Sequence, residues 1–191
     1  MPLNALTVSE RIVLVPRHAS NAIEMFAALD AHRDDLRQWL PWVDAMRSLM
    51  DVKRYAQFAE RQLAQELAFD FAIREDGRIV GGAGIHSVDP LSRNAQLGYY
   101  LLPPARGRGV LHRAAHALTG AAFTKLGFQR LEIRCIRENE RGRAVAERLG
   151  YRYEGMLEDA ELLHGAFRDV ALYAMTAPRW QAEHGDSETG A

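Results

Sequence analysis

Lysine and cysteine are scarce in this chain of 191 residues. Lys53 and Lys125 are the two lysines, so nearly all of the positive charge is arginine, and Cys135 is the single cysteine. One cysteine excludes an internal disulfide framework. The formal net charge of −1 at pH 7 argues against nonspecific nucleic-acid binding, because such binding needs a strongly basic face.

Long apolar runs are missing as well. No stretch of about 18 apolar residues could span a bilayer, and residues 1–11 lack the charged segment and apolar run of a signal peptide. We therefore expect a cytoplasmic protein with no membrane partner. Hydrophobic residues make up 48% of the chain, enough for one packed domain, which we place at residues 1–180. Residues 181–191 are polar and small, which predicts a disordered tail.

A loop rich in glycine and arginine stands at the centre of the sequence. Residues 96–102 predict a strand, which Pro103 and Pro104 end because proline offers the ladder no N–H. Residues 105–110 form the loop, and a helix begins near Gly109. Its apolar residues recur at helical spacing: Leu111, Ala115, Leu118 and Ala122.

This order of strand, glycine loop and helix start can build an anion site. The first amides of a helix have no internal partner, and the helix dipole places partial positive charge there. Gly107 and Gly109 lack a Cβ, so a phosphate oxygen could approach closely, and Arg106 and Arg108 add positive charge. The same spacing also fits an ordinary connection with solvated arginines, and the residues alone leave both interpretations open.

The other elements follow from periodicity and turn residues. Asp51 is the expected N-cap of one helix, and Asn139 and Gly150 bound another. The resulting order is β-αα-βββ-α-β-α-ββ, a mixed α/β fold of a single sheet flanked by helices. The expected strands are residues 11–16, 69–73, 78–86, 96–102, 131–135, 151–163 and 166–175, and the expected helices cover residues 21–29, 52–67, 109–126 and 140–149.

The central loop resembles the acyl-CoA pyrophosphate loop of the GNAT acetyltransferases, whose pattern is Gln/Arg-x-x-Gly-x-Gly/Ala. Arg106 and Gly109 match, and Leu111 stands at the last small position, a departure usual in the branch similar to RimJ and RimL. The resemblance covers residues 14–173 and implies that the strands before and after the central helix splay apart. Further matching motifs are Trp39-Leu40-Pro41-Trp42, Ile133-Arg134-Cys135, Glu138-Asn139 and Ala160-Glu161-Leu162 with Gly165.

The resemblance implies acetyl-CoA as cosubstrate and no metal. In this family, main-chain groups at the end of the strand before the loop hold the pantetheine arm and thioester, and an asparagine contacts the CoA arm. Asn139 could equally serve as a helix cap. The residues that we expect to bind the cofactor are Leu101, Leu102, Arg106, Gly107, Arg108, Gly109, Val110 and Asn139.

Glu161 matches the glutamate to which the resemblance assigns acid–base catalysis. A carboxylate in a partly apolar site can take the proton of an acceptor amine, whereas a solvated strand carboxylate would have no such role. The expected general acids are missing, because Gly142 and Ala146 occupy their positions. Cys135 alternates with apolar strand residues, which favours core packing over nucleophilic catalysis.

Four residues are expected to border the acceptor: Trp39, Trp42, His86 and Tyr99. The two tryptophans could equally pack beneath the first helices. His112 and His116 stand at i and i+4, but Arg113 replaces the glutamate of a His-Glu-x-x-His motif and no third ligand is evident, so we expect no metal.

These features predict an N-acetyltransferase that moves an acetyl group from acetyl-CoA to a primary amine. By the resemblance, the acceptor is a protein N-terminus, such as that of a ribosomal protein. The alternatives are a small-molecule amine acetyltransferase, a non-catalytic CoA-binding module and, more remotely, a basic-loop RNA-binding module. The sequence leaves the acceptor and a homo-oligomeric state open.

Overall fold

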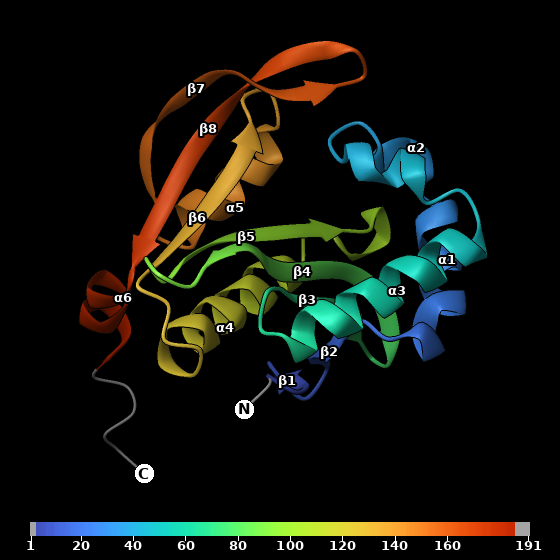
Figure 1. Ribbon diagram of the computed structural model, residues 1–191, viewed down its shortest axis with the longest axis horizontal. Helices are drawn as coiled ribbons and strands as arrows, with labels where there is room; N and C mark the ends of the chain where they lie inside the picture. The colour runs from blue at the N-terminus through green and yellow to red at the C-terminus, as the bar shows by residue number, and fades with distance from the viewer. Residues whose placement is uncertain (1–2, 186–191) are drawn as a thin grey trace.

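A computed structural model describes residues 3–185 as one eight-stranded sheet flanked by helices (Figure 1). The strand order is β1-β2-β3-β4-β5-β6-β8-β7. The strands are β1 (Leu6–Thr7), β2 (Ile12–Pro16), β3 (Phe69–Glu75), β4 (Arg78–Asp89), β5 (Asn94–Leu101), β6 (Arg130–Ile136), β7 (Arg152–Leu163) and β8 (Ala166–Thr176). The α-helices are α1 (Ala22–Asp30), α2 (Arg33–Leu36), α3 (Leu49–Ala64), α4 (Val110–Thr124), α5 (Glu140–Arg148) and α6 (Ala177–His184), with short 3-10 turns η1 (Ala19–Asn21), η2 (Pro41–Ala45) and η3 (Pro103–Ala105).

The sheet divides at β5 and β6, its one parallel pair. These strands are paired only from Asn94 to Gln96 against Arg130 to Glu132, and beyond that point they separate (Figure 1). All other neighbours are antiparallel. The mixed α/β fold and the splay between the strands around the central helix are therefore confirmed.

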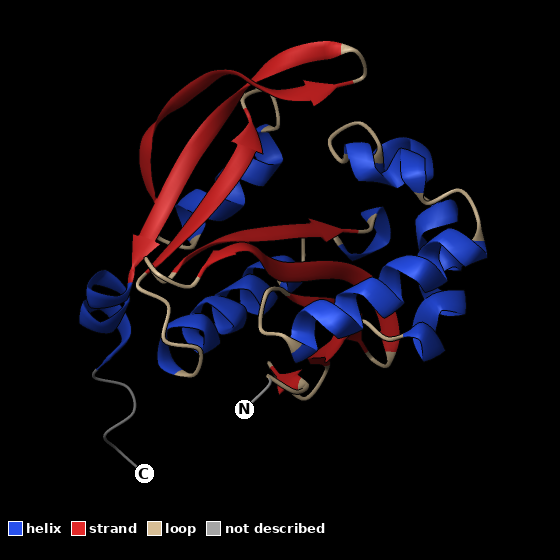
Figure 2. Ribbon diagram, viewed as in Figure 1, coloured by secondary structure: helices blue, strands red, loops and turns tan. Residues whose placement is uncertain are grey.

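Helices cover both faces of the sheet, as Figure 2 shows. Phe71 and Ile73 of β3 belong to the larger core, which includes α4, whereas Ala72 between them belongs to a smaller core with α1 and α3. This alternation follows from the period-2 geometry of a strand. Leu118 and Leu131 are fully buried in the larger core, between α4 and β6.

The helix after the two tryptophans begins earlier than its expected cap. Ser48 is the N-cap of α3, its hydroxyl accepting from the Asp51 amide at 3.2 Å while the Asp51 carboxylate accepts from the Ser48 amide at 2.9 Å. The prediction that Asp51 is the N-cap was therefore wrong. Asp51 is instead the acidic residue of a capping box, three positions after the N-cap.

The domain boundary expected at residue 180 also needs correction, because α6 continues to His184. Trp180 is 6% exposed and packs against Phe123 of α4 with ring centroids 6.0 Å apart, which anchors this helix. The remaining residues of the expected tail, 186–191, lie outside the described residues.

Candidate active site

The divergence of β5 and β6 opens a cleft of about 1720 Å³. Its walls come from β4, β5, β6 and β7, from the starts of α4 and α5, and from residues 35–46. It brings together residues far apart in the sequence, including most of the predicted site. The predicted residues that line it are Trp39, Trp42, His86, Tyr99, Leu101, Arg106, Gly107, Gly109, Val110, Asn139 and Glu161.

Leu102 and Arg108 do not line the cleft. Leu102 is 6% exposed in the smaller core, and its amide donates to the Val80 carbonyl at 2.8 Å. The guanidinium of Arg108 donates to Glu75 at 2.6 Å. Leu102 follows Leu101 on an extended chain, so the two side chains point to opposite faces.

The glycine loop presents free amides at the start of α4. Gly107 and Gly109 have φ of +78° and +72°, a left-handed conformation that glycine adopts without strain. Gly109 is the N-cap of α4, and no side chain in the described part of the chain caps this end. Within residues 3–185, the amides from Gly107 to Val110 donate to no acceptor of the chain. A 15-residue helix with such an end suits a phosphate.

The two loop arginines are already paired with carboxylates. Arg106 donates to both oxygens of Asp35, from Nη1 at 2.9 Å, and to the Leu101 carbonyl at 3.2 Å. This pairing holds the pKa of Asp35 below its usual value. The free positive charge that the sequence suggested for the loop is therefore largely balanced, although Arg106 still lines the cleft.

Five other arginines line the cleft, and none of them was an expected site residue. Two of the five, Arg17 and Arg134, are paired with Asp70 and Glu132. Arg113, Arg141 and Arg148 form no ion pair with a carboxylate among the described residues. Their spacing was a usable signal, because Arg113 lies one turn into α4 and Arg141 and Arg148 are two turns apart on α5. With the loop amides, they form a donor set that fits the several phosphates of acetyl-CoA.

Glu161 reaches the cleft because β7 is irregular. Leu157 pairs with Val170 and Glu161 with Arg168, so four steps along β7 match two along β8. The irregularity brings Ala160 and Glu161 to the cleft together. Partial burial raises the pKa of Glu161 above its ordinary value. Such a carboxylate is better able to take a proton from an amine near neutral pH.

The missing general acids have a structural explanation. A Cβ at Gly142 would lie 2.7 Å from Cys135 Sγ and 2.9 Å from Asn139 Nδ2, so a serine does not fit. Ala146 is completely buried, which leaves no room for a tyrosine. Asn139 accepts from the Gly142 amide at 3.0 Å and so caps α5 while lining the cleft.

Two other polar groups lie beside this helix start. Tyr99 donates from its hydroxyl to the Gly142 carbonyl at 3.0 Å, and burial raises its pKa. Burial also raises the pKa of Cys135 to about 12, so its thiol stays protonated at neutral pH. Because the thiolate is the nucleophile, Cys135 is not activated for covalent catalysis.

Aromatic side chains form the other end of the cleft. Trp42 is 38% exposed and meets Tyr100 edge-on, with centroids 5.5 Å apart. Trp39, Tyr55 and Phe58 line the same region, and His86 is exposed nearby on β4. The tryptophans that we expected to border the acceptor therefore line the cleft together with other aromatic residues, and we call this set the aromatic wall.

A buried polar network beneath this wall was not foreseen. Arg17 is 5% exposed and donates to Asp70 at 2.8 Å and to the Tyr100 hydroxyl at 3.1 Å, and Tyr55 also donates to Asp70. A Cβ at Gly82 would lie 2.3 Å from Arg17 Nη2, so this strand glycine makes room for the guanidinium.

The histidine pair of α4 has other partners. The rings of His112 and His116 stack with centroids 6.1 Å apart, and His112 Nε2–H donates to the Arg148 carbonyl at 3.2 Å. Across residues 3–185, no group of three or more His, Cys, Asp or Glu side chains could hold a metal ion. No helix in this part of the chain is long and apolar enough to cross a membrane.

Comparison with known families gives one domain match over most of the chain. Residues 11–152 match the family model described as an acetyltransferase (GNAT) domain. The ribosomal-protein-serine acetyltransferase of Escherichia coli K12 is 27% identical over 169 residues, which cover 88% of this chain and 94% of that protein. YdaF of Bacillus subtilis, whose own name as a ribosomal N-acetyltransferase is provisional, is 30% identical over 123 residues, 64% of this chain and 67% of that protein.

Solved structures share the fold. A ribosomal L7/L12 alpha-N-protein acetyltransferase in complex with coenzyme A superimposes with a TM-score of 0.88 at 23% identity, covering 92% of this chain and 99% of that one. At this identity the likeness shows the fold and carries no information on the acceptor.

Proposed function

We propose an acceptor for this protein from the premise that the chain belongs to the GNAT acetyltransferase family, whose domain model matches most of its length. It is an acetyl-CoA-dependent N-acetyltransferase. The acceptor that we propose is the α-amino group of a protein N-terminus, such as that of a ribosomal protein in the cytoplasm. The E. coli relative named for ribosomal-protein serine, similar over 88% of this chain, supports this acceptor.

The observation that carries the proposal is the charge of the cleft. Three acidic residues line it: Asp35 is paired with Arg106 and Asp70 with Arg17, whereas Glu161 has no ion pair among the described residues. A polyamine carries several positive charges and would need several free carboxylates. One free carboxylate suits an acceptor that brings a single reacting amine.

The mechanism follows from the positions of these groups. Acetyl-CoA supplies the acetyl group as an activated thioester. The free amides from Gly107 to Val110, with Arg113, Arg141 and Arg148, hold phosphate and so position the cofactor. Glu161 takes the proton from the acceptor ammonium and leaves a neutral, nucleophilic amine.

The departing thiolate needs no dedicated proton donor. A thiol has a pKa near 8.5, so its anion is a tolerable leaving group at neutral pH. Tyr99 keeps its proton because its pKa is raised, and its single O–H is donated to the Gly142 carbonyl rather than to the departing group. The same raised pKa makes Tyr99 a poor source of a transferred proton.

The test is thiol release from acetyl-CoA with a panel of peptides that differ in their N-terminal residue, run beside spermidine and other small amines. We expect turnover with free N-terminal peptides and none with the same peptides blocked at the α-amine. Turnover confined to small amines would replace this proposal with a small-molecule acetyltransferase. Binding of acetyl-CoA without turnover on any amine would favour a non-catalytic CoA-binding module.

A further inference from the structure

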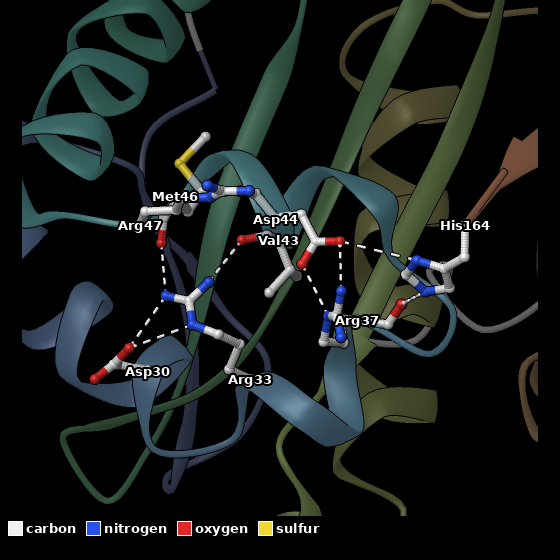
Figure 3. A network of polar contacts seen from close by, with 8 residues as sticks. All are labelled: Asp30, Arg33, Arg37, Val43, Asp44, Met46, Arg47 and His164. Atoms are coloured by element: carbon white, nitrogen blue, oxygen red, sulfur yellow. Dashed lines mark hydrogen bonds and ion pairs between the residues drawn. The ribbon is translucent and has the colours of Figure 1, made fainter.

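The tip of the β7–β8 hairpin touches the segment that carries the two tryptophans. His164 and Gly165 form the two-residue turn, both with positive φ (+50° and +80°). His164 Nε2–H donates to the carbonyl oxygen of Arg37 at 2.7 Å, a contact between residues 127 positions apart (Figure 3). The tip of the hairpin thus contacts the chain directly after α2.

The segment that accepts this hydrogen bond is itself held by side-chain contacts. Arg37 donates to both oxygens of Asp44, at 2.9 and 3.0 Å, and Asp44 Oδ2 lies 3.8 Å from His164 Nδ1. Arg33 donates to the carbonyls of Val43 and Met46, each at 2.7 Å (Figure 3). These contacts hold the turn around Trp39 and Trp42 in one shape.

His164 itself does not line the main cleft. It borders a smaller hollow of about 500 Å³, which shares Gln38, Trp39 and Ile136 with the main cleft. Other charged groups around this hollow are Asp34, Arg37, Glu138 and Arg168. His164 stands three residues after Glu161 on the same hairpin, so its contact restrains the strand that carries the base.

We propose that His164 is a positioning residue whose hydrogen bond to Arg37 holds the hairpin bearing Glu161 against the segment bearing Trp39 and Trp42. We call this contact the clasp. The clasp sets the separation between the carboxylate and the aromatic wall, and so fixes where the acceptor amine lies. Because it acts on the acceptor, this role rests on the proposed function, whereas the clasp itself is a property of the fold. We expect acetyl-CoA binding not to depend on it, because the polar partners of His164 are Arg37 and Asp44 and neither belongs to the glycine loop.

The test uses His164→Asn, because Asn-Gly is the preferred sequence for a two-residue turn with positive φ. The variant keeps the hairpin, but its side chain is one bond too short to replace Nε2. Losing one hydrogen bond and its restraint should raise the acceptor KM about 3- to 10-fold. The Kd for acetyl-CoA should stay unchanged.

Two controls separate the clasp from general effects. Asp76→Asn makes the equivalent change at the Asp76–Gly77 turn, which also has two positive φ values and lies in the β3–β4 hairpin. It should leave the acceptor KM unchanged. His164→Gln places an amide nitrogen as many bonds from Cβ as Nε2, and should restore part of the wild-type KM.

A second measurement needs no turnover. Spin labels at Ala45→Cys and Ala166→Cys, both exposed, in a Cys135→Ala background report the separation between segment and hairpin tip. We expect a broader distance distribution in His164→Asn than in wild type. An unchanged distribution, or a broader one with an unchanged acceptor KM, would overturn the clasp. Inactivity of the wild type on every amine would refute the proposed function and leave the spin-label result to decide the clasp.

Discussion

The hydroxyl of Tyr99 donates a hydrogen bond to the main-chain carbonyl of Gly142 over 3.0 Å. Tyr99 belongs to β5 and Gly142 to α5, so this bond spans the gap that opens where β5 and β6 separate. It places a protonated phenol and a capped helix start at the same point of the cleft. Residue 142 is a glycine, and its missing side chain leaves space for Cys135 and Asn139 beside this bond.

Glu161→Gln should lower kcat/KM about 10²- to 10⁴-fold, the usual cost of losing a general base. In the wild type, activity rises as pH passes upward through the raised pKa of Glu161. The variant should recover part of its rate toward pH 8, where an α-amino group with a pKa near 8 loses its own proton. The measurement is kcat/KM against pH, with Glu158→Gln, exposed on the same strand, as control. Near-wild-type activity at every pH would remove Glu161 from the mechanism.

The same substitution should make the fold more stable at neutral pH. A carboxylate whose pKa is raised by folding contributes stability when protonated and loses it as pH rises through the folded pKa. Glu161→Gln removes this loss of stability. The difference in the free energy of unfolding between variant and wild type should therefore shrink as pH falls toward the ordinary glutamate pKa of about 4.3. Thermal melts across this range measure it. Because Glu161 is partly exposed, we expect a small stabilisation, and a less stable variant at neutral pH would contradict it.

Gly109→Glu should lower the affinity for acetyl-CoA at least about tenfold, because it places bulk and negative charge among amides that bind phosphate. Gly127→Glu is a matched control, since Gly127 has φ of +71°, close to the +72° of Gly109, and open space beside it. Both variants carry similar backbone strain, so calorimetric titration isolates the phosphate contact. Equal affinities in the two folded variants would place the cofactor elsewhere.

Two arginines should respond differently to the same change. Arg148→Gln should weaken acetyl-CoA binding about tenfold, because a hydrogen bond to a charged group is lost. Arg108→Gln should leave binding intact and instead reduce the free energy of unfolding by about 1–3 kcal/mol. The reason is that the carboxylate of Glu75, which is 9% exposed, loses the guanidinium that pairs with it. Titration and urea denaturation of both variants test this. Weaker acetyl-CoA binding in Arg108→Gln alone would show that the loop arginines, and not Arg148, bind the phosphates.

Trp42→Ala should raise the acceptor KM more than the KM for acetyl-CoA, because the indole borders the aromatic end of the cleft. Tyr153→Ala, a change to a half-exposed aromatic outside the cleft, is the comparison. Steady-state kinetics with one responsive peptide gives both constants. A loss of thermal stability with unchanged KM values would show that Trp42 only packs against its neighbours.

Local patterns determined much of this protein from its sequence alone. The alternation at Phe71 and Ile73, the helix start after Gly109 and the asparagine cap at Asn139 all depend on residues within one turn or one hairpin. Such contacts are encoded by neighbours in the chain, so periodicity finds them. The family resemblance added the splayed sheet and Glu161, which no spacing rule would have selected.

Only the tertiary structure decided which charges are free. Arg106 and Arg108 look available in the sequence, but their partners Asp35 and Glu75 lie 71 and 33 positions away. Among the described residues, the unpaired guanidinium groups in the cleft belong instead to other arginines, one of them Arg148. The attraction between two charges weakens steeply once they are more than a few ångströms apart in space. Sequence spacing does not measure that distance across a folded sheet.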